Sequence, residues 1–133
     1  MLDHVSLGVT ELQRSRRFYD AVLRPLGLVR TVDFQGRGSD YGTMAGQFGV
    51  EFTITVEASG ASPSQGMHVC FRAPDREAVR AFHQAALTAG GSDDGGPAVR
   101  VQYHPDYYAA FALDPDGHRI EAVCHAPAAP AIV

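Results

Sequence analysis

The sequence repeats itself at a spacing of 64 residues, and this repeat constrains the fold more than any other feature. The matched pairs are His4 and His68, Arg16 and Arg80, Phe18 and Phe82, Ala21 and Ala85, Leu23 and Leu87, and Gly27 and Gly91. The first copy begins with HVSLGV and the second with HVCFRA, and in each a helical pattern that ends near glycine follows. Self-similarity at one fixed spacing indicates a single structural unit used twice.

Each copy has the pattern of a strand, a helix and three shorter strands. Apolar and polar residues alternate over residues 2–9 and 67–72, which predicts a strand with one apolar face at the start of each copy. Thr10 and Gln13 form a capping-box pattern before the first helix, and DPDG at residues 114–117 predicts a tight hairpin. Further strands are predicted at residues 28–34, 41–45, 50–56, 99–103, 108–113 and 119–124. The expected fold class is α+β, with two βαβββ modules.

A chain of 133 residues that is 45% hydrophobic fits one globular domain with its own core. We expect residues 1–133 to form that domain. Within it we expect a first module at about 1–58, a linker at about 59–66, a second module at about 67–125 and a loose tail at 126–133. The linker, SGASPSQG, is rich in Gly, Ser and Pro, and the tail is rich in Pro and Ala.

Charge and hydropathy argue against several classes of protein. The net charge of -4 gives no general attraction to nucleic acid, and no run approaches the roughly 18–20 apolar residues that cross a membrane. The N-terminal MLDHVSLGV does not resemble a secretion signal, so a cytoplasmic location is expected. Phosphate-binding glycine spacings and a GxSxG element are missing from the sequence. Cys70 and Cys124 lie in apolar runs and are interpreted as small buried side chains.

Two histidines and one glutamate suggest a metal site. His4 and His68 begin equivalent strands and lie opposite the apolar row of each, so pseudo-symmetric pairing of the modules would bring both imidazoles into one cleft. Glu121 lies on the polar side of the last predicted strand. A divalent ion needs such side chains to converge at about 2.0–2.2 Å. These three residues are therefore the predicted ligands of one divalent ion, with Fe, Mn, Ni, Zn and Mg all left open.

The sequence also resembles a known superfamily over nearly its whole length. HVSLGV with RSRRFYDAVLRPLGL, then HVCFRAPDREAVRAFHQAALTAGG, then YYAAFALDPDGHRIEAV, is similar to the vicinal-oxygen-chelate superfamily of glyoxalases, bleomycin-resistance proteins and extradiol dioxygenases. The resemblance implies modules that form a half-barrel cup, with metal ligands at His4, His68 and Glu121. The glutamate found in glyoxalase I would fall at or near Thr53, where threonine is a poor ligand. A slipped register would place Glu51 there instead.

Other candidate site residues lie close to these strands. In the segment YHPDYY, His104 or Tyr108 is predicted to act as a catalytic acid or base, and Tyr107 to contact substrate. Arg72 lies on the same strand face as His68, where it would bind an anionic group of the substrate. Thr53 is predicted to contact substrate as well.

Two functions of different classes follow. The first is a metal-dependent enzyme, a lyase or isomerase or an extradiol-type dioxygenase, whose ion binds a small substrate through two adjacent oxygens. The alternative is a metal-free protein that binds or sequesters a small molecule, as bleomycin-resistance proteins do. An interaction module without catalysis is a third possibility. Relatives of this type dimerise and open sheet edges invite pairing, so a homodimer is expected.

Overall fold

The helices and strands of the chain follow one another in two similar series. The computed structural model describes residues 1–43, 51–57 and 59–131. The first series is β1 (Val5–Val9), α1 (Leu12–Leu23), the 3-10 helix η1 (Arg24–Leu26), β2 (Leu28–Phe34), β3 (Gly38–Thr43) and β4 (Phe52–Val56). The second is β5 (His68–Arg72), α2 (Arg76–Thr88), β6 (Ser92–Asp93), β7 (Ala98–Val99), β8 (Tyr108–Leu113) and β9 (Arg119–Cys124).

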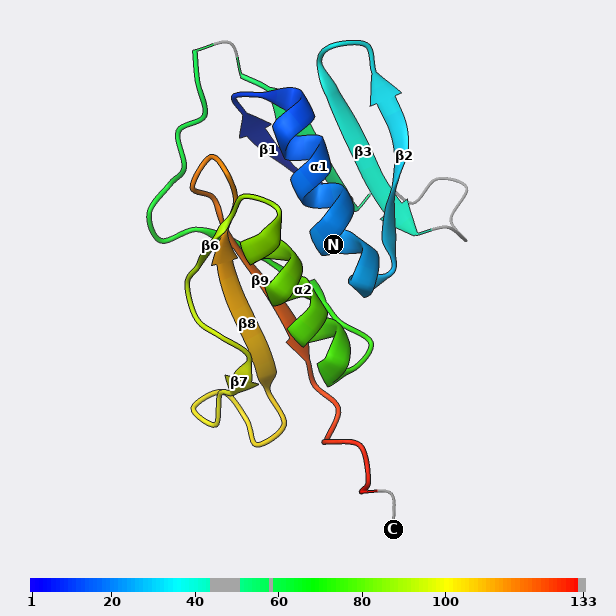
Figure 1. Cartoon of the computed structure of the whole chain (residues 1–133), viewed down its shortest axis with the longest axis vertical. Coiled ribbons are helices and arrows are strands. Elements are labelled where there is room, and N and C mark those ends of the chain that lie inside the picture. Colours follow the sequence, from blue (N-terminus) through cyan, green and yellow to red (C-terminus); the bar gives the residue numbers. More distant parts are fainter. Residues whose placement is uncertain (44–50, 58, 132–133) are drawn as a thin grey trace.

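Each series builds its own sheet with the same strand order. The first sheet has the order β1-β4-β3-β2 and the second β5-β9-β8-β6, with β7 also paired to β8. In both, the first strand runs parallel to the last, β1 to β4 and β5 to β9. The two short strands β6 and β7 take the edge position that β2 holds in the first sheet (Figure 1). The α+β fold of two βαβββ modules is therefore confirmed.

The strands predicted at residues 28–34, 108–113 and 119–124 agree with the structure. Of the strands predicted at 41–45 and 50–56, residues 44, 45 and 50 lie outside the described residues. The strand predicted at 99–103 is wrong, because only Ala98–Val99 pairs and the chain then turns, with the Tyr103 N–H donating to Arg100 O. Val101 and Tyr103 are 73% and 62% exposed, so the apolar residues of this alternating pattern do not pack against the core.

The capping box predicted for α1 is not formed. The residue that precedes the helix is Glu11, which makes no side-chain cap. The Thr10 hydroxyl instead accepts from the Ala61 N–H, while the Thr10 N–H donates to Asp116 at 3.2 Å. The predicted hairpin that carries Asp116 is confirmed, since the Gly117 N–H donates to Asp114 O at 2.9 Å and Gly117 has a φ of 93°. A tertiary contact thus replaces the local cap.

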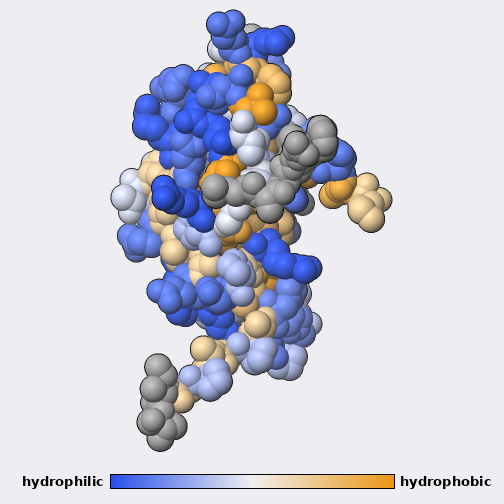
Figure 2. All heavy atoms as spheres, turned by 90° about the vertical axis from the view of Figure 1, so that its right-hand side faces the viewer, coloured by the Kyte–Doolittle hydropathy of each residue, from blue (hydrophilic) through white to orange (hydrophobic). Residues whose placement is uncertain are grey.

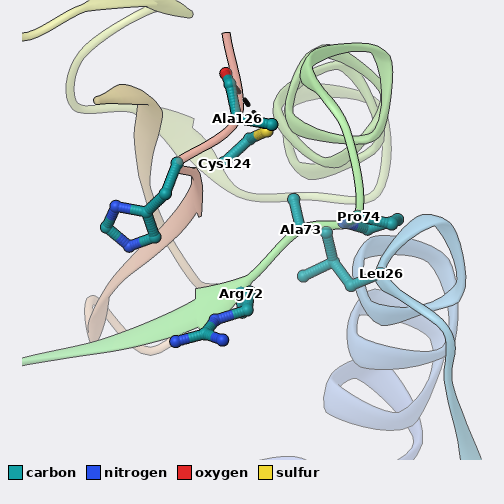
Figure 3. A pocket seen from close by; sticks show the side chains of 7 residues that line it. Leu26, Arg72, Ala73, Pro74, Cys124 and Ala126 are labelled. Atoms are coloured by element: carbon teal, nitrogen blue, oxygen red, sulfur yellow. Dashed lines mark hydrogen bonds between the residues drawn. The ribbon is translucent and has the colours of Figure 1, made fainter. Parts of the chain in front are cut away.

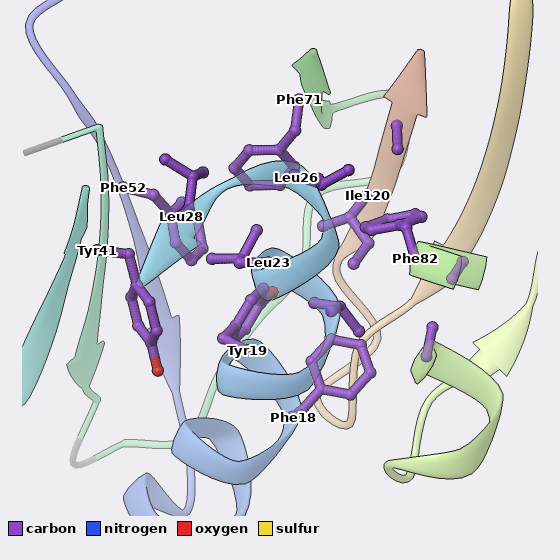
Figure 4. Close-up of a cluster of buried hydrophobic side chains, with 14 of the residues drawn as sticks. Phe18, Tyr19, Leu23, Leu26, Leu28, Tyr41, Phe52, Phe71, Phe82 and Ile120 are labelled. Carbon is purple, nitrogen blue, oxygen red and sulfur yellow. The ribbon is translucent and has the colours of Figure 1, made fainter. Parts of the chain in front are cut away.

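One apolar core joins the two modules. The buried cluster includes side chains of α1, β4, β5, α2 and β9, and Figure 4 shows α1 between the first sheet and the elements of the second module. The rings of Phe52 in β4 and Phe71 in β5 meet edge to face at 5.3 Å between centroids. The helices α1 and α2 also pack against each other (Figure 1). Helix packing therefore holds the modules together.

Each sheet has one face covered by its helix and one that we call the open face. Ile120, Ala122 and Phe71 face the helices and are buried. The residues between them point the other way, and the open face of the second sheet carries His68, Cys70, Arg72, Phe111, Arg119 and Glu121. Alternation along a strand produces this division. Seen from the side that β2 occupies in Figure 1, the surface is mostly hydrophilic with small apolar areas (Figure 2). Among the described residues, neither helix is long and apolar enough to cross a membrane.

A buried carboxylate anchors α1 to the second module. The Tyr19 hydroxyl donates to Asp114 Oδ2 at 2.6 Å, and the N–H groups of Asp116 and His118 donate to Asp114 Oδ1 at 2.9 Å. Asp114 is only 3% exposed, and its burial raises the pKa of the carboxyl above its usual value. Burial, followed by the charge of Asp114, raises the pKa of Tyr19 well above normal, so the phenol stays protonated and keeps donating.

We predict that Tyr19→Phe lowers the free energy of unfolding by about 1–3 kcal/mol, because buried Asp114 loses a donor that water cannot replace. Tyr41→Phe is the matched control. The Tyr41 hydroxyl donates to Asp20 at 2.9 Å, but the Asp20 side chain is 41% exposed and water can take the place of the phenol. Urea denaturation of both variants measures the difference. Equal losses would show that Asp114 is not the anchor.

Candidate functional site

Glu121 is the centre of the candidate site. It lies on β9 beside the parallel strand β5, and its side chain is 2% exposed. His68 Nε2 lies 3.0 Å from Glu121 Oε1, and the Tyr107 hydroxyl donates to Oε2 at 2.6 Å. Since a carboxylate only accepts, His68 carries its hydrogen on Nε2 in this arrangement. The sequence placed His68 and Glu121 together, and the structure brings them into direct contact.

An aromatic and cationic wall lies beside this pair. Phe111 is the register partner of Glu121 on β8, and its ring is 5.8 Å from that of His68. The Arg119 guanidinium stacks over the Phe111 ring at 4.1 Å and donates through Nε to Asp94 at 2.6 Å. Cation–π stacking holds the ring in place. The His68 side chain is 37% exposed, so the pair is reached from the open face.

Cys70 belongs to the site, which the sequence analysis did not predict. It is the register partner of Glu121 and is exposed, whereas Cys124 is buried as predicted. Desolvation by surrounding atoms, and then the charge of Glu121, raise the pKa of Cys70 to about 12. Desolvation and the bond to Glu121 also raise the pKa of Tyr107. Both groups therefore stay protonated and neutral beside the carboxylate at neutral pH.

His4 is not part of this group within one chain. It precedes β1, its side chain is 47% exposed, and Nδ1 lies 2.6 Å from Asp3 Oδ1. Across residues 1–43, 51–57 and 59–131, no three or more His, Cys, Asp or Glu side chains are close enough to hold an ion. The three-ligand set therefore stays a prediction, with His68 and Glu121 as the pair that is already assembled.

Thr53 lies on the open face of the first sheet with a different partner. Its hydroxyl donates to Asp40 Oδ1 at 2.7 Å, and Asp40 is its register partner on β3. Asp40 is 8% exposed and was missed by the sequence analysis. Glu51 lies two residues before Thr53 and lines a hollow of about 360 Å³ together with His4, Cys70 and Arg72. The acid that contacts Thr53 is thus Asp40 on the adjacent strand, and the predicted contact of Thr53 with substrate stays a prediction.

The two residues predicted as acid or base catalysts do not contact Glu121. Tyr108 lies on the helix side of β8, where its ring packs under Arg76 and its hydroxyl accepts from Arg80 at 3.3 Å. Tyr108 therefore lies on the other side of β8 from Phe111 and Glu121, because residues an odd number of positions apart on a strand point to opposite faces, and its predicted role as acid or base stays a prediction. Tyr107, predicted to contact substrate, is the tyrosine that contacts the site.

His104 has both ring nitrogens occupied. The Asp106 N–H donates to Nδ1 at 3.0 Å, so Nε2 carries the hydrogen and donates to His125 Nδ1 at 2.8 Å. The rings of His104 and His125 each meet Tyr107 edge to face, at 5.5 and 5.3 Å. His104 therefore orients Tyr107 and His125, and catalysis by His104 would require it to give up one of these bonds. Nothing in the sequence pattern indicated His125.

The sequence matches a known protein family over most of its length. The profile of the Glyoxalase/Bleomycin resistance protein/Dioxygenase superfamily matches residues 1–122. The chain belongs to this superfamily. A comparison with curated proteins finds no match.

Solved structures of the superfamily superpose on nearly the whole chain. A glyoxalase/bleomycin resistance protein from Albidiferax ferrireducens T118 is 33% identical, with a TM-score of 0.78, covering 93% of this chain and 98% of its own. A glyoxalase/bleomycin resistance protein/dioxygenase family enzyme from Burkholderia phytofirmans PsJN is 16% identical, with a TM-score of 0.68, covering 93% and 98%.

A mutant of the fosfomycin resistance protein FosX from Listeria monocytogenes is 17% identical, with a TM-score of 0.66, covering 92% of this chain and 88% of its own. That structure holds Mn(II) and 1S,2S-dihydroxypropylphosphonic acid. At this identity the likeness to the Burkholderia and Listeria proteins concerns the fold alone.

We predict that Glu121→Gln lowers the pKa of Cys70, because the variant removes a negative charge that disfavours the thiolate. The pKa should remain above the ordinary thiol value of about 8.5, since desolvation is the larger cause and persists. Alkylation by iodoacetamide, followed against pH in the presence of EDTA, should therefore be faster at pH about 9 than in the wild type. Glu77→Gln, an exposed acid on α2, is the control and should change nothing. An unchanged profile in Glu121→Gln would contradict this electrostatic coupling.

Proposed function

We propose that this protein is a metal-dependent enzyme in which His68 and Glu121 bind one divalent ion that holds a small substrate by two adjacent oxygens. The observation that carries the proposal is the contact between His68 Nε2 and the buried carboxylate Oε1 of Glu121, on neighbouring parallel strands. Membership of the superfamily and the Mn(II) in the Listeria protein support it.

The two side chains fit such an ion. Imidazole and carboxylate are ligands that Zn, Mn and Fe accept. His68 Nε2 and Glu121 Oε1 are 3.0 Å apart. To bind through Nε2, His68 would shift its hydrogen to Nδ1.

We further propose that a second copy of the chain completes the ligand set. His4 lies outside the His68 and Glu121 group of its own chain, and two protein ligands are fewer than such sites use. The free edges of β1 and β5 are not paired to any described strand, which favours association with another chain. In a symmetric homodimer, His4 of each chain would join His68 and Glu121 of the other.

The protein side chains set up the chemistry around the ion. When bound, the ion would supply Lewis-acid stabilisation of an oxyanion that forms on the substrate. Tyr107 holds Glu121 Oε2 and so fixes the direction of Oε1. Cys70 remains a neutral thiol and adds no competing charge, while Phe111 with its stacked Arg119 forms one wall. This arrangement suits a lyase, an isomerase or, with iron, an extradiol-type dioxygenase.

A metal-free binding protein is the second candidate, and one observation favours it. Both carboxylate oxygens of Glu121 already have protein donors, His68 and Tyr107, so the buried acid is satisfied without an ion. In that case the open face would bind its small molecule by shape, aromatic contact and hydrogen bonds alone. Metal content separates the two functions.

Anaerobic reconstitution followed by elemental analysis should find one ion per chain in the wild type. His68→Asn should weaken metal binding by more than about tenfold, since even the loss of a residue behind the ligands costs about 10–100-fold. His83→Asn is the matched control, because His83 also pairs with a carboxylate, Asp93, at 2.8 Å. Absence of metal in the wild type, or equal losses in both variants, would favour the binding protein.

A mixing experiment tests the shared site. His4→Ala and His68→Ala chains should each lose tight metal binding when pure. After unfolding and refolding together in equal amounts, half of the dimers contain one chain of each kind, and each of these has one intact site. About a quarter of all sites should then recover. A site built within one chain would show no recovery.

A further inference from the structure

A second hollow lies at the far end of the open face from His68. Its volume is about 760 Å³, and Arg72 and His125 line it. Figure 3 shows Arg72 projecting from the end of β5, with Leu26, Ala73 and Pro74 nearer the helices. The other lining residues are apolar or carry a thiol: Leu26, Ala73, Pro74, Cys124 and Ala126. Leu26, Ala73 and Cys124 are almost fully buried, so they form an apolar floor below a polar rim.

The hydrogen-bond network fixes a donor on His125. Since His125 Nδ1 accepts from His104, the hydrogen of the neutral ring is on Nε2. Among the described residues, Nε2 makes no hydrogen bond. His125, which lines the hollow, therefore has an N–H donor without a partner among the described residues. Its ring stacks on that of His104 at 5.1 Å between centroids, and this stacking limits its rotation.

Arg72 adds a positive charge that the described residues leave without an ion pair. No carboxylate from residues 1–43, 51–57 or 59–131 lines this hollow, although Asp3 and Glu51 line the neighbouring one that shares Arg72 and Leu26. A guanidinium and an imidazole N–H beside an apolar floor match an oxyanion attached to a short apolar group. A cation would meet no carboxylate of the described residues there.

We propose that this hollow binds a small organic anion, whose carboxylate contacts Arg72 and His125 and whose apolar part covers Leu26 and Ala73. Arg72 follows Cys70 by two residues on the same face, about 6.6 Å along the strand. Cys70 is the register partner of Glu121, so one molecule can reach from the hollow to the His68 and Glu121 pair. The anion is then the charged end of the substrate, and this last step rests on the proposed function.

Hexanoate is the probe, titrated into the full chain with EDTA present and followed by the imidazole C–H signals in NMR spectra. We expect saturable binding with a Kd of about millimolar order. Arg72→Gln should weaken it by about tenfold and His125→Phe by about fivefold. Arg17→Gln, which removes an exposed charge from α1, is the matched control and should leave the Kd unchanged.

Three results would overturn the proposal: equal binding by wild type and Arg72→Gln, equal binding of hexanoate and 1-hexanol, or the same loss in Arg17→Gln. EDTA excludes a metal bridge to the His104 and His125 pair. Glu121→Gln separates this inference from the proposed function, because it should lose the ion and keep hexanoate binding. Arg72→Gln should show the converse result, with weaker hexanoate binding and unchanged metal binding. A failure of the hollow and a failure of the metal site are therefore distinguished.

Discussion

The hairpin between β8 and β9 holds the two modules in register. Asp114 accepts from the Tyr19 phenol, and Asp116, which is 3% exposed, accepts from the Thr10 N–H and from Arg14. His118 Nε2 lies 2.7 Å from Gly8 O, so its imidazole donates to β1. The bond from Tyr19 to Asp114 is buried and is costly to break, because water cannot replace it. One turn thus fixes α1, β1 and the start of β9, the strand that carries Glu121.

Among residues 1–43, 51–57 and 59–131, packing through the helices leaves the open faces of both sheets without a cover. α1, η1 and α2 contact one another, while the two described sheets share no hydrogen-bonded strand pair. The first sheet exposes Val32 and Phe34, and in the second half of the chain Met67 and Tyr103 are exposed as well. Exposed apolar side chains near unpaired strand edges are typical of surfaces that another chain covers. Such an arrangement is consistent with a site whose ligands come from two copies.

The repeat and the strand alternation were sufficient to predict the α+β fold and to place His68 and Glu121 on one sheet face, whereas His4, the third predicted ligand, lies outside that pair. They failed where the residues on the two faces of a strand are similar, because the pattern then does not indicate which face is buried. In YAAFAL the alanines on both faces are buried, so the sequence did not tell which tyrosine, Tyr107 or Tyr108, faces the site. Alternation does place Cys70 beside His68, but its apolar neighbours favoured a buried interpretation. The pairing of distant His125 with His104 depends on tertiary packing alone.

Two buried acids, Asp114 in the hairpin before β9 and Glu121 on β9, differ in the partners that they contact. Asp114 takes its hydrogen bonds from backbone N–H groups and from a phenol within the core, and no exposed group reaches it. Glu121 is as deeply buried, yet one of its partners, His68, is 37% exposed on the open face. A ligand can displace His68 from Oε1 without opening the core, whereas it cannot reach Asp114 unless α1 separates. Access through an exposed partner, rather than burial itself, is what distinguishes Glu121 from Asp114.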